Sequence, residues 1–114
     1  MSVIGTVYKS TTLGHVSYPA NTNTIALELT DVPSGTYGIT AGLRFTEGNT
    51  VGGNQYLESK SGTQLSPVFG FFPAFGYFGM SVVVNFNGGG INYNIASRTA
   101  ATASSGSLTA IRLK

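Results

Sequence analysis

The stretch FGMSVVVNFNGGGINYNI, residues 78–95, alternates apolar with small or polar side chains on both sides of a glycine-rich turn. Strict alternation is typical of β-strands that bury one face. The Asn87-Gly88 step between the two runs favours a tight hairpin, because glycine adopts the positive φ that such turns need. Residues 78–95 therefore predict two antiparallel strands, with two apolar stripes: Phe78, Met80, Val82, Val84 and Phe86, then Ile91, Tyr93 and Ile95.

The same alternation extends outward from this hairpin in both directions. Two earlier stripes are Ile25, Leu27 and Leu29, and then Tyr37, Ile39, Ala41, Leu43 and Phe45. A closing segment places Leu108 and Ala110 on one side and Thr109, Ile111 and Leu113 on the other, so we expect a strand covered on both faces. Turn signals separate the runs at short intervals. The pattern predicts an all-β protein of about eight or nine strands: one antiparallel β-sandwich domain, a jelly roll, over residues 1–114.

The N-terminal segment leaves two possibilities open. Val3, Val7 and Val16 fit a further strand of the sandwich, whereas Met1–Lys9 fits an extended arm that reaches a neighbouring subunit. A nine-residue arm would span roughly 30 Å. We expect the sandwich strand.

Composition excludes several classes of protein. The chain of 114 residues has no Cys, so it forms no disulfide, thiolate zinc site or cysteine nucleophile. Only 9% of residues are charged and the net charge is +2. Nucleic-acid binders need clustered Lys and Arg, so we expect no nucleic-acid partner. The longest apolar-looking stretch is aromatic and interrupted by Pro73, so we expect no membrane partner.

Groups for catalysis are scarce. His15 is the only histidine, the sequence has no G-x-S-x-G motif, and a half-exposed strand position explains this residue well. The four acids are scattered, which argues against a glycosidase pair and against a calcium loop: Glu28, Asp31, Glu47 and Glu58. We predict that the chain is not an enzyme and holds no cofactor or metal.

The stretch PVFGFFPAFGYFGM, residues 67–80, is dense in aromatic side chains, with six Phe or Tyr among fourteen residues. One interpretation is two core strands with a bend at Pro73. The other is an interface between identical subunits, because one small core already receives the other stripes and surplus exposed aromatics mark contact surfaces. Ten formal charges offer little repulsion between copies, and self-association would cover strand edges.

Two segments resemble the tumour-necrosis-factor-like jelly roll, a family shared with complement globular heads and several phage proteins. These are the closing segment Ser105–Lys114, and Pro33–Tyr37 with the alternation that follows to Phe45. The resemblance implies a homotrimer with aromatic side chains around its axis. On this basis the candidate subunit-interface residues are Tyr77, Phe78, Phe86 and Tyr93.

The chain is also similar in character to small phage virion proteins, being rich in Gly, Ser, Thr and Asn. This similarity implies a capsid decoration (cement) protein located in the virion, whose partners are its own copies and the major capsid protein or another virion protein. The strand pattern begins close to Met1, which favours this role over a stalked fibre. The alternative is a tail-fibre head or another receptor- or carbohydrate-binding module, which contacts a host surface glycan through loop residues: Asn49, Asn54, Gln55, Tyr56 and Asn92.

Overall fold

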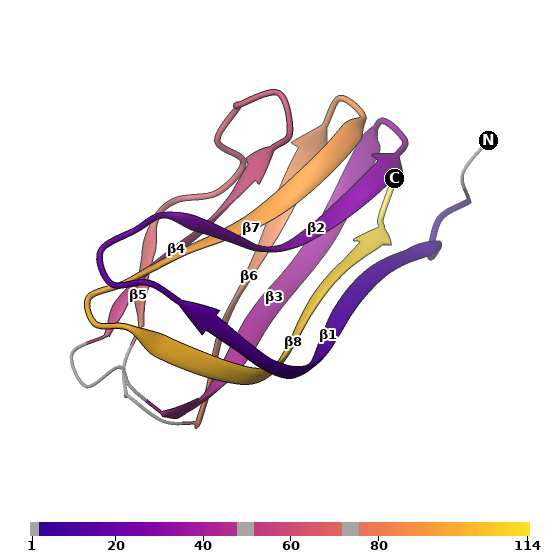
Figure 1. The fold of residues 1–114 in the computed structure, drawn as a ribbon. Coiled ribbons are helices and arrows are strands. Elements are labelled where there is room, and N and C mark those ends of the chain that lie inside the picture. Colours follow the sequence, from indigo (N-terminus) through magenta and orange to yellow (C-terminus); the bar gives the residue numbers. More distant parts are fainter. Residues whose placement is uncertain (1–2, 48–51, 72–75) are drawn as a thin grey trace.

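The computed structural model describes residues 3–47, 52–71 and 76–114; within these ranges the side chains of residues 12–16, 47, 71, 76 and 77 are not described. The described residues contain no helix (Figure 1). The strands in chain order are β1 (Val7–Tyr18), β2 (Thr24–Val32), β3 (Gly35–Glu47), β4 (Gly53–Ser59), β5 (Phe69–Phe71), β6 (Gly76–Phe86), β7 (Gly89–Ser97) and β8 (Ala101–Arg112).

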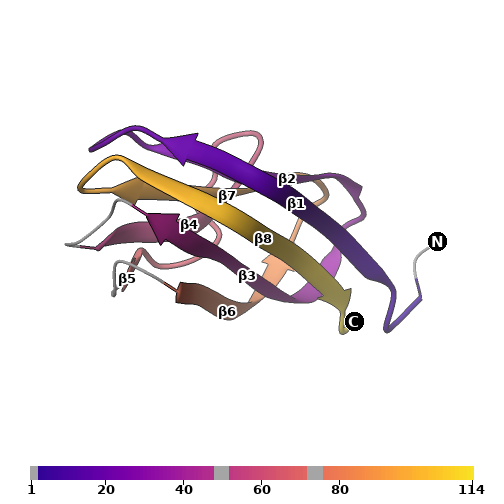
Figure 2. The same ribbon diagram turned by 60° about the horizontal axis from the view of Figure 1, so that its bottom comes forward.

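The strands form two antiparallel four-stranded sheets that pack face to face (Figure 2). One sheet has the order β1-β8-β3-β6 and the other has the order β2-β7-β4-β5. Successive strands therefore alternate between the sheets in most steps, and the first strand pairs with the last. This is the double Greek-key order of an eight-stranded jelly roll, so the predicted fold class is confirmed.

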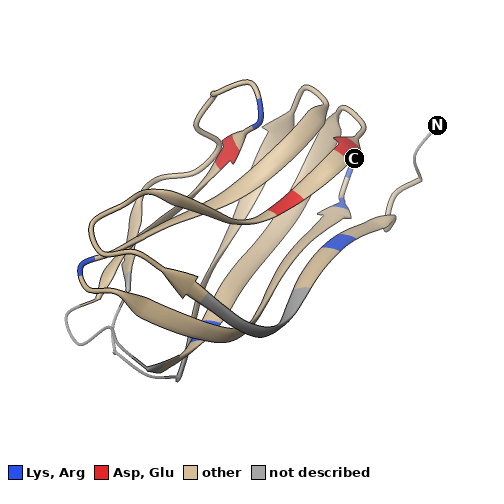
Figure 3. Cartoon of the chain, in the orientation of Figure 1, with Lys and Arg blue, Asp and Glu red and all other residues tan. Residues whose placement is uncertain are grey.

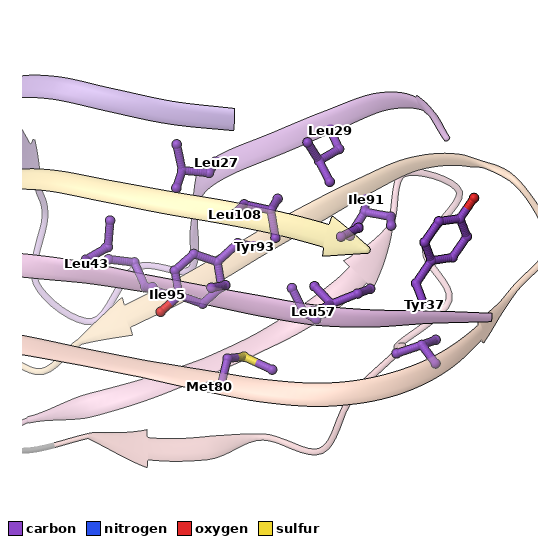
Figure 4. Packing of buried hydrophobic residues seen from close by; sticks show 14 of the residues in the cluster. Leu27, Leu29, Tyr37, Leu43, Leu57, Met80, Ile91, Tyr93, Ile95 and Leu108 are labelled. Atoms are coloured by element: carbon purple, nitrogen blue, oxygen red, sulfur yellow. The ribbon is translucent and has the colours of Figure 1, made fainter. Parts of the chain in front are cut away.

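The core lies between the two sheets, where the predicted stripes meet. Figure 4 shows side chains of both sheets filling this space. The stripe of β3 is almost fully buried, with every member at most 1% exposed: Tyr37, Ile39, Ala41, Leu43 and Phe45. In the opposite sheet, β7 contributes the buried residues Ile91, Tyr93 and Ile95. Strand β6, which lies beside β3, adds Met80, Val84 and Phe86 to the core.

The predicted hairpin at Asn87-Gly88 is wrong, because β6 pairs with β3 in one sheet whereas β7 pairs with β2 and β4 in the other. The turn between these two strands carries the chain from one sheet to the opposite one. Its positive φ values fall on Gly88 (φ 97°) and Gly89 (φ 113°), while Asn87 keeps a negative φ. Glycine therefore supplies the left-handed backbone at both positions.

Strands β3 and β6 approach each other closely where Gly42 of β3 pairs with Gly79 of β6, and this approach requires residues without a side chain. A Cβ on Gly42 would lie 2.6 Å from the carbonyl oxygen of Phe78.

Two details of the predicted pattern are wrong. Ile25 is 51% exposed, because the register of β2 against β7 shifts between Ile25 and Leu27 and turns Ile25 to the outer face. In the closing segment, Leu108 and Ala110 are buried, but Ile111 and Leu113 are 41% and 43% exposed. A single copy of the chain therefore covers only one face of β8.

The N-terminal segment takes the first of its two possibilities from Val7 onward. Strand β1 pairs antiparallel with β8 from Val7, opposite Ile111, to Tyr18, opposite Ala101. The prediction of a sandwich strand is confirmed for these residues.

Candidate functional site on the outer sheet faces

The four predicted interface residues do not form a common surface. Phe86 is 4% exposed and Tyr93 is fully buried, so the prediction is wrong for both: their stripes face the opposite sheet within the same chain. Phe78 is half-buried and packs against Phe45, with 5.0 Å between the ring centroids. The side chain of Tyr77 lies outside the described residues.

Tyr93 belongs to a polar link that crosses the core. Its hydroxyl donates to Gln55 Oε1 at 2.6 Å, and Gln55 Nε2 donates to the carbonyl oxygen of Gly79 at 3.2 Å. Burial, and then the neighbouring Tyr18, raise the pKa of Tyr93. Burial also raises the pKa of Tyr18. Gln55 is 1% exposed and ties the two sheets together, so its predicted place in a ligand-binding loop is wrong.

Three of the predicted ligand residues share one sheet face and do not lie in loops, although Asn54 stands opposite Ala96, four positions along β7 from Asn92. Asn54 and Tyr56 of β4 and Asn92 of β7 all point outward, because the alternate residues of both strands face the core. Asn92 is only 5% exposed, so its predicted place in a solvated loop is wrong. Asn49 lies outside the described residues.

The outer face of the β2-β7-β4-β5 sheet, called here the amide face, carries two rows of side chains across three strands. One row pairs Asn92 with Glu28 of β2 and Glu58 of β4. The next row pairs Asn94 with Ile25 on one side and Tyr56 on the other. Asn94 was not among the predicted ligand residues, although it stands two residues from Asn92 and therefore on the same face of the strand.

The outer face of the β1-β8-β3-β6 sheet is different in character. One row across all four strands pairs Val7 with Ile111, Ile111 with Gly38, and Gly38 with Val83. Val7 is 54% exposed and Val83 is 70% exposed. Leu113 lies beside Gly38 and extends the same surface. We call Val7, Ile111, Gly38 and Val83 the apolar row.

Strand β6 is an edge strand of this sheet, and the described residues place no further strand beside it. Its eleven residues contain no charge and no proline, and its pairing with β3 runs without a register shift from Gly35–Phe86 to Phe45–Gly76. Edge strands are usually protected by charges, proline, bulges or shortness. The edge of β6 has none of these protections.

The other three edge strands are protected. Strand β1 carries Lys9 and a register irregularity between Leu13 and Val16. Strand β2 carries Glu28 and Asp31 and two register shifts, and β5 has only three residues. Charged residues are sparse along the strands of both sheets (Figure 3). The unprotected edge of β6 therefore distinguishes it among the four described edges.

Among the described residues, no group of three or more His, Cys, Asp or Glu side chains is placed to hold a metal ion. The same part of the chain has no helix that is long and apolar enough to cross a membrane.

Comparison with known proteins supports the fold. No protein-family model matches the chain, and no curated protein matches it. The structure is similar to that of FlhE, at 10% identity and a TM-score of 0.55, over 98% of this chain and 100% of that one. It is similar to a chain of the infectious bursal disease virus Gx strain, at 15% identity and a TM-score of 0.59, over 97% of this chain and 34% of that one.

A second viral match is the VP2 subviral particle of infectious bursal disease virus, at 12% identity and a TM-score of 0.56, over 94% of this chain and 32% of that one. The chain thus spans about a third of the length of the viral chains that it matches. At these identities the likeness shows the fold alone: a jelly-roll β-sandwich.

Proposed function

We propose that this chain is a non-enzymatic structural protein of a virus particle, a decoration protein that works as a symmetric homo-oligomer on the particle surface. Its partners are its own copies and the major capsid protein or another virion protein. It acts by binding and not by catalysis. Each copy makes a weak contact with the particle, and the contacts of a symmetric oligomer together bind neighbouring subunits with a higher overall affinity.

The observation that carries this proposal is the exposed apolar row together with the edge of β6. A soluble sandwich ordinarily keeps polar residues on its outer sheet face. Here Val7, Ile111 and Val83 are 41–70% exposed in one row that crosses four strands. Burying such side chains contributes on the order of 1 kcal/mol each. A face of this kind favours contact with protein over contact with water.

The size of this face is sufficient for a stable contact. The molecule extends 43 × 24 × 18 Å, so its broad face covers on the order of 1,000 Å². A standard specific interface buries about 800 Å² on each partner. The remaining outward side chains of the described face are mostly small, which permits close approach of a second flat surface.

The copy number of three comes from the resemblance to the tumour-necrosis-factor-like family and stays part of this proposal. Phe86 and Tyr93 do not form the axis, because both lie in the core. We place the contact at the apolar row and the edge of β6. Placement in a virion draws support from a viral chain, named as a VP2 subviral particle, about a third of which has this fold.

The proposal contains no catalytic step. Burial in an apolar pocket is a common way to raise the pKa of a carboxyl group so that it can act as a general acid. Glu28 is exposed and Glu58 is half-buried on an outer face. Asp31 is exposed at the end of β2. The positions of these three carboxylates are consistent with a proposal that contains no catalytic step.

The experiment is a quantitative peptide analysis of virus particles purified from the source of the chain. We expect the chain in the particles, in a fixed whole-number ratio to the major capsid protein, as symmetric binding requires. Absence from the particles, or a ratio that varies with each purification, would contradict the proposal. Particles of the same virus with the gene for this chain deleted, purified in the same way and then mixed with the chain, are the control for nonspecific adherence.

A further inference from the structure

The amide face holds two buried side chains whose hydrogen bonding is incomplete. Asn92 and Asn94 are 5% and 3% exposed. Among the described residues, neither Asn92 Oδ1 nor Asn94 Nδ2 has a hydrogen-bond partner. Buried polar atoms are nearly always paired, because an unpaired one loses its bond to water without replacement. Two such atoms on one outer face indicate a surface at which a ligand supplies the missing hydrogen bonds.

A hydrogen bond between two side chains crosses the amide face near Asn94. The side-chain nitrogen Asn23 Nδ2 donates to the Tyr56 hydroxyl at 2.7 Å. Asn23 precedes β2 and Tyr56 lies on β4, so this bond spans the intervening β7 near Asn94. Asn23 itself is exposed and Tyr56 is half-buried. A ligand can therefore reach Asn94 by displacing one exposed hydrogen bond.

The chemistry of the two atoms selects the ligand. One is an acceptor and the other is a donor, and a hydroxyl group both donates and accepts. A metal cation would satisfy only Asn92 Oδ1. An anion would satisfy only Asn94 Nδ2 and would be repelled by Glu28 and Glu58, which flank Asn92. A ligand that carries several neutral hydroxyl groups satisfies both atoms.

A peptide main chain also offers a donor and an acceptor, but peptides add to sheets at edges, through backbone groups. The amide face presents side chains. It also presents the half-buried ring of Tyr56, which can pack against the apolar side of a sugar ring once its bond to Asn23 is released. These properties favour a carbohydrate over a peptide.

We propose that the amide face binds a neutral carbohydrate, whose hydroxyl groups bond to Asn92 Oδ1 and Asn94 Nδ2 and replace the Asn23–Tyr56 hydrogen bond. Glu28 and Glu58 accept hydrogen bonds from hydroxyl groups at the rim of the site and exclude acidic sugars. This site lies on the sheet opposite the apolar row, so it stands or falls independently of the assembly.

The test measures binding of the whole chain to immobilised oligosaccharides that end in neutral hexoses, N-acetylhexosamines, sialic acid or uronic acid, with unrelated peptides on the same surface. We expect binding to at least one neutral sugar and none to the acidic sugars. Asn92→Leu and Asn94→Leu should each weaken binding about tenfold or more. Asn23→Ala should strengthen it, because the covering bond is gone. Thr40→Ala, an exposed position on the other sheet, is the matched control and should bind as the unchanged protein does.

A melting curve separates loss of binding from loss of fold. Asn94→Leu removes an unpaired buried N–H, so its melting temperature should not fall. The proposal is overturned if the unchanged protein binds no neutral sugar, or binds only acidic sugars or peptides. It is also overturned if both leucine variants bind as strongly as the unchanged protein.

Discussion

At the scale of single residues, the Tyr93 hydroxyl bonded to Gln55 is the most informative contact of the core. Tyr93→Phe leaves Gln55 Oε1 buried without a donor. We expect a loss of about 1–3 kcal/mol in the free energy of unfolding, measured with urea. Tyr56→Phe is the control, because it removes a hydroxyl whose bond to Asn23 is exposed. Equal losses in the two variants would contradict the structural role of the core link.

The same residue predicts how stability depends on pH. Burial raises the pKa of Tyr93 and of Tyr18 above the value of 10.0 that applies in the unfolded chain. The folded state therefore holds both hydroxyls neutral, and their contribution is complete below pH 10 and is lost as pH rises beyond it. The fall approaches about 1.4 kcal/mol per pH unit for each group. Urea unfolding on both sides of pH 10 should show a shallower fall for Tyr93→Phe, and an unchanged slope would contradict it.

Gly42 and Gly38 form a matched pair of residues on β3. A Cβ at position 42 would lie 2.6 Å from the carbonyl oxygen of Phe78, whereas a Cβ at position 38 would meet only Leu113 Cδ1 at 3.7 Å. We expect Gly42→Ala to lower the free energy of unfolding by about 1–3 kcal/mol, because the paired backbone must move apart. Gly38→Ala should leave it unchanged or raise it slightly. The reverse order in chemical denaturation would show that β3 and β6 do not approach closely at this point.

At the scale of elements, alternation alone predicted the inward stripes of β3, β6 and β7, because a period of two assigns each side chain to a face. The same pattern could not place Ile25. One register shift between Ile25 and Leu27 reverses the face of that side chain, and no turn residue in the sequence signals it. Local irregularities in pairing depend on the partner strand, which a single sequence does not reveal.

We expect the unprotected edge of β6 to contact a second copy of the chain, and a charge placed there tests this. Val83→Lys places a charge at a 70% exposed position on the unprotected edge, where it should block pairing with a second copy. We expect the assembly to dissociate while the melting temperature of the single chain stays nearly unchanged. Thr30→Lys, at an exposed position of β2 on the other sheet, is the matched control. An oligomer of unchanged mass in Val83→Lys would exclude the edge of β6 as a contact.

At the scale of the whole molecule, the jelly roll followed from the number and spacing of alternating runs, and the strand order confirmed it. The candidate site did not follow. Phe86 and Tyr93 satisfied the pattern for a core strand and for an interface equally well, and only the pairing of the two sheets placed them inside. Ile111 and Leu113 are a second example of what the pattern could not settle. The sequence has apolar residues on both faces of the closing segment, but it does not show what covers the second face, where these two side chains are exposed.

The proposed function depends on self-association of the chain, and the mass of the protein in solution reports on that directly. Light scattering on the purified chain should be recorded across about a tenfold dilution. We predict a constant mass that is a multiple of 11.8 kDa, with three copies as the number that the trimeric resemblance implies. A mass of 11.8 kDa at every concentration would contradict self-association, because the apolar row would then be exposed in the working form of the protein.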